Sequence, residues 1–89
     1  MGKVVATINV VPEGVETDLE KIKIEIEKVV PPQAEIHQIK EEPIAFGLVS
    51  LKVFVTLEDA AGGTDPIEKA FSTIKGVRRV ETVDVRRLL

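Results

Sequence analysis

The run L-V-S-L-K-V-F-V-T-L-E, residues 48–58, constrains the fold more than any other stretch of the chain. Apolar residues recur at every second position, which is the period of a β-strand with one buried face. We therefore expect a strand over residues 48–58. Its core face consists of Val49, Leu51, Val53, Val55 and Leu57.

Three further segments also predict strands. Residues 3–11 alternate well and end at Pro12-Glu13-Gly14, which breaks the pattern. Residues 33–42 alternate less well, because Ile36 and Ile39 are out of phase, and this indicates a bulge. The last strand is expected over residues 77–88, with a phase shift between Val80 and the pair Val83 and Val85.

Two segments predict amphipathic helices. The first has capping-box spacing, with Thr17 as N-cap and Glu20 three residues later, and it ends at Pro31-Pro32. The second follows a turn over residues 60–63, with Asp65 as cap and Pro66 at the first helical position. Gly76 suits the C-terminal cap of this second helix. The two apolar stripes are Leu19, Ile22, Ile26, Val29 and Val30, and then Ile67, Ala70, Phe71 and Ile74.

The resulting order, β-α-β-β-α-β, predicts an α+β ferredoxin-like sandwich. Right-handed crossovers place both helices on one face of a four-stranded antiparallel sheet. We expect residues 1–89 to form a single domain, since a second core would not fit in this length. The other sheet face is expected to be open and to carry Thr7, Asn9, Ser50, Lys52 and Phe54.

The composition narrows the function classes. No cysteine is present, and the apolar runs fall short of the roughly 20 residues that a membrane span needs. We therefore expect a cytoplasmic protein with no membrane partner. A net charge of −3 argues against nucleic-acid binding. The arginines near the C-terminus are therefore interpreted as solvated side chains of a charged edge strand. They are Arg78, Arg79, Arg86 and Arg87.

Catalytic and metal-binding patterns are missing from the sequence. His37 is the only histidine, so no histidine cluster or catalytic triad can form. The carboxylates lack the spacing of a calcium loop, and A-G-G-T, residues 61–64, lacks the lysine of a phosphate loop. We expect no metal site, no cofactor and no covalent chemistry, which leaves binding.

Phe46 is the residue that stands out for a binding role. It is one of three aromatic residues, and it lies between a loop that Pro43 marks and a core strand, beside Ala45 and Gly47. A side chain of this size either covers the end of the core or anchors a partner protein. The residue pattern alone leaves both interpretations open.

Two neighbouring stretches resemble the elongation factor 1-beta family, in its short archaeal form. They are P-I-A-F-G-L-V-S-L-K-V, residues 43–53, and V-T-L-E-D-A-A-G-G-T-D-P-I-E-K-A-F, residues 55–71. The resemblance extends over the whole chain. It implies a guanine-nucleotide exchange factor of translation, whose partner is the GTPase elongation factor 1-alpha. Such a factor binds the nucleotide-free GTPase better than the nucleotide-bound form, and so it weakens nucleotide affinity.

The resemblance also implies site residues. In the family, the aromatic of the Pro-x-x-aromatic-Gly loop inserts against the GTPase, so Phe46 is the candidate anchor, with Pro43, Ala45 and Gly47 around it. Eukaryotic members carry a lysine next to the C-terminus that reaches the partner's Mg²⁺ site. This sequence has V-R-R-L-L there, so Arg86 and Arg87 are the candidates for that role.

Two other functions fit the same topology. A small-ligand regulatory domain is usually fused to an enzyme or paired as a dimer. A ribosome-associated RNA-binding domain would use Lys52, Phe54 and the terminal arginines, but its expected pair of stacking aromatics is missing. The exchange-factor hypothesis is preferred, and we expect the free protein to be monomeric.

Overall fold

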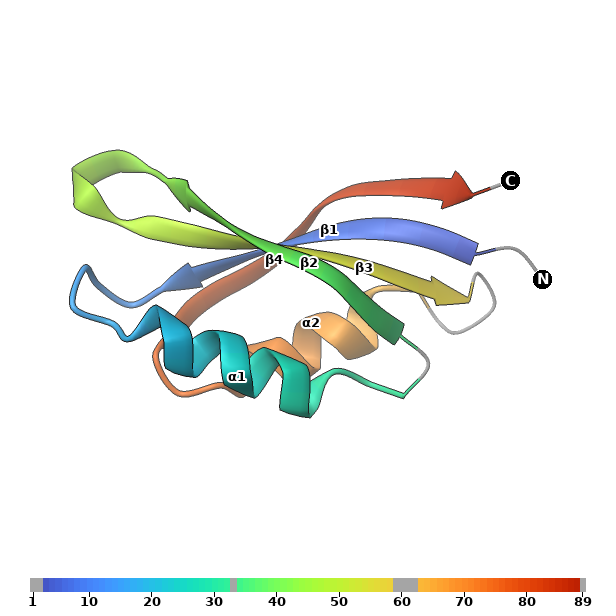
Figure 1. The fold of residues 1–89 in the computed structure, drawn as a ribbon, viewed down its shortest axis with the longest axis horizontal. Helices are drawn as coiled ribbons and strands as arrows, with labels where there is room; N and C mark the ends of the chain where they lie inside the picture. The colour runs from blue at the N-terminus through green and yellow to red at the C-terminus, as the bar shows by residue number, and fades with distance from the viewer. Residues whose placement is uncertain (1–2, 33, 59–62, 89) are drawn as a thin grey trace.

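A computed structural model describes residues 3–32, 34–58 and 63–88 (Figure 1). The elements follow the predicted order of strands and helices, with a short 3₁₀ turn, η1, between the second and third strands. The bounds are β1 Lys3–Pro12, α1 Leu19–Val29, β2 Ala34–Pro43, η1 Ala45–Gly47, β3 Val49–Glu58, α2 Asp65–Ser72 and β4 Val77–Leu88. Gln33, at the start of the predicted second strand, and residues 60–62 of the predicted turn lie outside the described residues.

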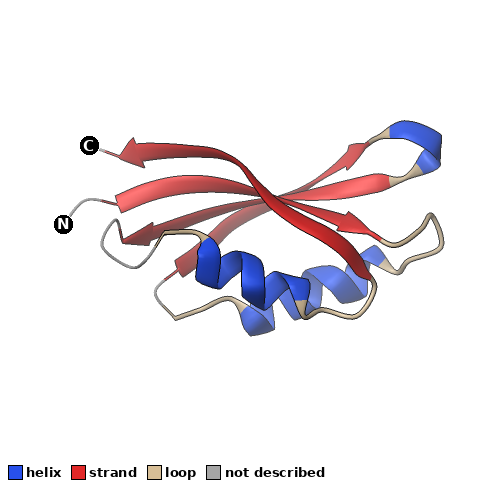
Figure 2. Cartoon of the chain, turned by 180° about the vertical axis from the view of Figure 1, so that it is seen from behind, coloured by secondary structure: helices blue, strands red, loops and turns tan. Residues whose placement is uncertain are grey.

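The four strands form one sheet in the order β2-β3-β1-β4, and every neighbouring pair is antiparallel. Both helices lie against the same face of this sheet (Figures 1 and 2). The ferredoxin-like α+β prediction is therefore confirmed. Neither of the two helices described has the length and the apolar run that crossing a membrane requires.

The core lies between the helices and the central strands. β1 and β3 pair with Ala6 opposite Val55 and Ile8 opposite Val53, so their apolar faces coincide. The predicted stripes of both helices pack onto this face, because their apolar positions recur at helical spacing. The buried hydrophobic residues include Val4, Ala6, Ile8, Val10, Ile22, Ile26, Leu51, Val53, Val55, Leu57, Ile67, Phe71 and Ile74.

Both predicted N-caps are wrong by one residue. The cap of α1 is Asp18, whose carboxylate accepts from the Glu20 and Lys21 backbone N–H groups at 3.1 and 3.3 Å. The Thr17 hydroxyl instead accepts from the Gly14 backbone N–H at 3.1 Å. At α2 the cap is Thr64 rather than Asp65, so Pro66 occupies the second helical position.

The C-terminal end of α2 also differs from the prediction. The helix ends at Ser72 with Thr73 as its C-cap, and Gly76 lies three residues further on. Gly76 has φ +95° and ends the turn that leads into β4. This left-handed position favours glycine. Gly76 therefore shapes the turn rather than the helix end.

Both predicted irregularities in the sheet are present. In β2 the register shifts between Ile36 and Gln38. In β4, Thr82 pairs with Ile8 and Asp84 pairs with Thr7, which leaves Val83 as an extra residue. Without this bulge Thr82 and Asp84 would share one face, since strand side chains alternate. With it, Thr82 faces α2 and bonds the Glu68 carboxylate.

The face of the sheet away from the helices carries the predicted residues, but part of it is not open. Ser50 and Thr7 are both buried. Phe54 is half-buried, and the Lys40 ammonium lies 5.7 Å from its ring centre, within cation–π range. This face is therefore a mixed polar surface with little exposed aromatic area.

Candidate partner-binding site

The hairpin that joins β2 to β3 closes in a tight turn around Phe46. The Ile44 N–H donates to the Leu48 carbonyl at 2.7 Å, and the Leu48 N–H donates to the Ala45 carbonyl at 3.3 Å. These two bonds enclose Phe46 and Gly47, which both have positive φ, +61° and +78°. Glycine adopts this conformation readily, whereas an L-residue with a side chain is strained by roughly 1–2 kcal/mol.

The Phe46 side chain points into solvent and is 94% exposed, the largest exposed fraction among the exposed large hydrophobic residues of the described chain. The interpretation of Phe46 as a cover for the end of the core is therefore wrong. The adjoining Pro43, Ala45 and Gly47 are exposed as well. The turn thus presents an unburied aromatic on a strained backbone, and strain of this kind is concentrated at functional sites.

The second set of predicted site residues lies elsewhere. Arg86 and Arg87 pair with Val5 and Val4 near the start of β1, whereas the Phe46 turn extends beyond the far end of that strand. The two groups occupy opposite ends of a molecule 41 Å long (Figure 1). The structure therefore does not bring the arginines together with Phe46.

Arg86 and Arg87 also differ in where they point. Their partners Val5 and Val4 lie on opposite faces of β1, so Arg86 is on the face away from the helices and Arg87 is on the helix side. The Arg86 Nε donates to Asp84 Oδ2 at 2.9 Å. Because this ion pair is exposed, it holds Arg86 only weakly.

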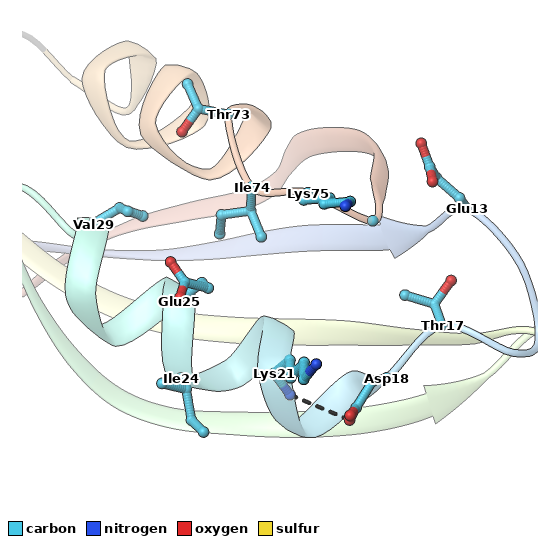
Figure 3. A pocket seen from close by; sticks show the side chains of 11 residues that line it. Glu13, Thr17, Asp18, Lys21, Ile24, Glu25, Val29, Thr73, Ile74 and Lys75 are labelled. Carbon is cyan, nitrogen blue, oxygen red and sulfur yellow. Dashed lines mark hydrogen bonds between the residues drawn. The ribbon is translucent and has the colours of Figure 1, made fainter.

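A groove of about 660 Å³ lies between α1 and the turn that joins α2 to β4 (Figure 3). Its lining mixes acidic residues such as Asp18 and Glu25 with Lys21 and Lys75, around a floor that includes Ile74. It contains none of the predicted site residues.

Other polar groups show no arrangement for chemistry. The His37 ring Nε2 lies 2.9 Å from the Thr56 hydroxyl, at the bulge of β2. Within residues 3–32, 34–58 and 63–88, no three His, Cys, Asp or Glu side chains gather in a way that could hold a metal ion.

Sequence reasoning missed one neighbour of the Phe46 turn. Val15, in the loop between β1 and α1, is 64% exposed. A Cβ built on Gly47 would lie 3.6 Å from Val15 Cγ1, which is ordinary van der Waals contact. The sequence offered one weak signal, an apolar residue inside the otherwise polar segment E-G-V-E-T-D, residues 13–18.

Fold and turn together define a small ferredoxin-like α+β domain that exposes an aromatic side chain on a strained hairpin. The model of the EF-1 guanine nucleotide exchange domain matches residues 5–88, and the chain belongs to this family. The predicted family is thereby confirmed, and with it a nucleotide-exchange role in translation elongation. The regulatory-domain and RNA-binding alternatives are not favoured.

The curated relatives agree with this assignment over at least 98% of their length. Elongation factor 1-beta of Methanothermobacter thermautotrophicus is 54% identical over 89 residues, which cover 100% of both chains. The protein of the same name from Methanobrevibacter smithii is 47% identical, again over 100% of both chains. That of Methanococcoides burtonii is 46% identical over 98% of each.

Proposed function

We propose that this chain accelerates GDP release from elongation factor 1-alpha, and that the Phe46 turn is its anchor on the GTPase. The observation that carries the proposal is the 94% exposed Phe46 on a left-handed backbone. An aromatic so exposed gains its burial only when a partner covers it. The family and the archaeal relatives support the exchange reaction and this class of partner.

The proposed mechanism makes and breaks no covalent bond. The protein, acting as one domain, binds the nucleotide-free GTPase more tightly than the GDP-bound form, and by linkage it lowers GDP affinity by the same factor. An exchange factor that bound both forms of the GTPase equally tightly would leave its GDP affinity unchanged. Pro43, Ala45 and Gly47 shape the turn so that the Phe46 ring projects beyond it.

Arg86 and Arg87 are proposed to act at the phosphate and Mg²⁺ site of the GTPase. Their guanidinium groups carry positive charge at the end of the molecule away from Phe46. A cation placed there competes with Mg²⁺ for its anionic ligands, which are among the strongest contacts that hold the nucleotide. A guanidinium is broader and flatter than an ammonium, so it would approach those ligands side-on through paired N–H groups.

The direct test of the proposal is to measure affinity for the two states of the partner. Isothermal titration calorimetry would compare the chain's dissociation constants for purified archaeal elongation factor 1-alpha, nucleotide-free and loaded with GDP. We expect at least about a 100-fold preference for the nucleotide-free form, a coupling of ~3 kcal/mol. Equal dissociation constants would contradict the proposal.

A further inference from the structure

The loop between β1 and α1 forms a second tight turn. The Thr17 N–H donates to the Gly14 carbonyl at 3.2 Å, and the Thr17 hydroxyl accepts from the Gly14 N–H at 3.1 Å. Val15 and Glu16 therefore occupy the two central positions of a β-turn. Both side chains face solvent, and Val15 is 64% exposed.

This turn is fixed to the body of the domain on its other side. The Glu13 N–H donates to the Gly76 carbonyl at 2.8 Å. A Cβ on Gly76 would lie 3.1 Å from Thr17 Cγ2, so the two loops are in close contact. A turn held in this way has little conformational entropy left to lose on binding, which favours a contact surface.

The two turns lie at the same end of the molecule (Figure 2). Val15 lies within contact range of the position where Gly47 would carry a Cβ, and Gly47 follows Phe46. Ile44, at the base of the hairpin turn, is 39% exposed. We call Val15, Ile44 and Phe46 the tip patch. Apolar side chains gathered on a surface mark interaction sites, whereas single exposed ones need no explanation.

Carboxylates border the tip patch. Glu13 and Glu16 lie on the Val15 turn, and neither has an ion pair among the residues that the structure describes. Glu41 and Glu42, near the end of β2, are partly neutralised by Lys23 and Lys52. A partner surface complementary to this one has an apolar pocket with lysine or arginine side chains at its rim.

We propose that Val15 is a second anchor, and that the tip patch with its acidic rim docks as one surface on a basic-rimmed apolar pocket of the GTPase. The inference rests on the proposed function, because the GTPase is the occupant. It adds to that function a residue from a different loop and the chemistry of the partner's surface. The hydrogen bonds that fix the Val15 turn to the domain hold it in place, so that both turns can contact the GTPase together.

The first experiment removes the Val15 methyl groups. Val15→Ala deletes two carbons, and we expect its dissociation constant for nucleotide-free elongation factor 1-alpha to rise about tenfold. Ile24→Ala is the matched control, because Ile24 is 51% exposed but lies on α1. The control should change the dissociation constant less than about twofold. Both variants should keep the wild-type melting temperature, since neither side chain is in the core.

The second experiment tests the acidic rim. Glu16→Lys should weaken the same binding, more strongly at low salt than at high salt, because the added lysine faces a basic pocket rim. Glu27→Lys places the same charge on an exposed position of α1 and should have little effect.

The outcomes separate this inference from the function on which it rests. Wild-type affinity in Val15→Ala, together with loss in Phe46→Ala, would overturn the second anchor and leave the exchange function standing. Tighter binding by Glu16→Lys would contradict the proposed basic rim of the GTPase pocket. If the wild-type chain itself fails to bind nucleotide-free elongation factor 1-alpha, the proposed function fails and the inference with it.

Discussion

Phe46 combines two unfavourable features, a left-handed backbone and an uncovered aromatic ring. Neither is compensated within the domain, because the side chain has no core contact and the φ of +61° is one that glycine would adopt without strain. The turn persists because the hydrogen bonds of Ile44 and Leu48 close around it. Stability has therefore been given up at this one residue, as expected where binding requires a side chain in a fixed direction.

Replacing Phe46 by glycine should stabilise the domain. Phe46→Gly removes the left-handed strain, and after the added freedom of the unfolded chain we expect the free energy of unfolding to rise by about 0.5–1 kcal/mol. Urea denaturation followed by circular dichroism measures this. Ala45→Gly is the control: Ala45 lies in the same turn without a positive φ, so that variant should be less stable than the wild type. A loss of stability in both variants would show that the turn holds no strain.

At single residues, the sequence predicted candidates better than it predicted contacts. Phe46 was identifiable because a large aromatic beside glycine is unusual at a loop. Val15 was not, because only the fold brings it close to Gly47, which lies in a loop distant in sequence. The cap of α1 fell on Asp18 for a local reason. The Thr17 hydroxyl, equally suited to capping, is engaged by the Gly14 N–H in the preceding turn.

At the scale of elements, the positions at which apolar residues recur predicted the irregularities of the strands correctly. The bulges in β2 and β4 were predictable because a slip of one residue moves every later side chain to the other face. The start of α2 was harder to place. Thr64 donates to the Glu68 carboxylate at 3.2 Å, and Glu68 also accepts from Thr82 on β4. This contact between helix and strand has no signature in the local sequence.

One ion pair between elements makes a testable pH prediction. Lys23 on α1 donates to Glu41 on β2 at 2.6 Å, and this contact is the main cause that raises the pKa of Lys23 above its ordinary value of 10.5. The raised pKa means that the contact stabilises the fold at any pH where Lys23 is charged in both the folded and the unfolded protein. The stabilisation is lost as the pH rises through the folded-state pKa.

We therefore expect Glu41→Gln to be less stable than the wild type at neutral pH and equally stable well above pH 10.5. Urea unfolding of both proteins from neutral to strongly alkaline pH measures the difference. Glu27→Gln on the exposed side of α1 serves as the control and should track the wild type throughout. A difference between Glu41→Gln and the wild type that persists at alkaline pH would show that the carboxylate acts through something other than the charge of Lys23.

At the scale of the whole molecule, the informative feature is the separation of the two proposed contact regions. The Phe46 turn and the pair Arg86 and Arg87 lie at opposite ends of the 41 Å long axis. The sequence predicted both groups but not their separation. The separation depends on how β1 pairs with its two neighbours and on how far the hairpin of β2 and β3 extends past β1. A partner that contacts both ends must offer two separate surfaces.

This separation predicts that the two regions act independently. Phe46→Ala and Arg87→Ala should each slow nucleotide release, and their effects on the activation free energy should add to within about 0.5 kcal/mol in the double variant. Lys3→Ala, at the same end of the sheet as Arg87, is the control for an unspecific loss of charge. Strong non-additivity would indicate that both residues act through one shared contact.

The central claim, that Phe46 anchors the exchange reaction, is tested most directly by stopped-flow release of a fluorescent GDP analogue from elongation factor 1-alpha. The wild-type chain and the Ile24→Ala control should both accelerate release strongly. We expect Phe46→Ala to lose at least about 30-fold of that acceleration, the effect of truncating a hot spot worth ~2 kcal/mol. Its circular dichroism spectrum and melting temperature should stay those of the wild type. Acceleration by Phe46→Ala equal to that of the wild type would contradict the account.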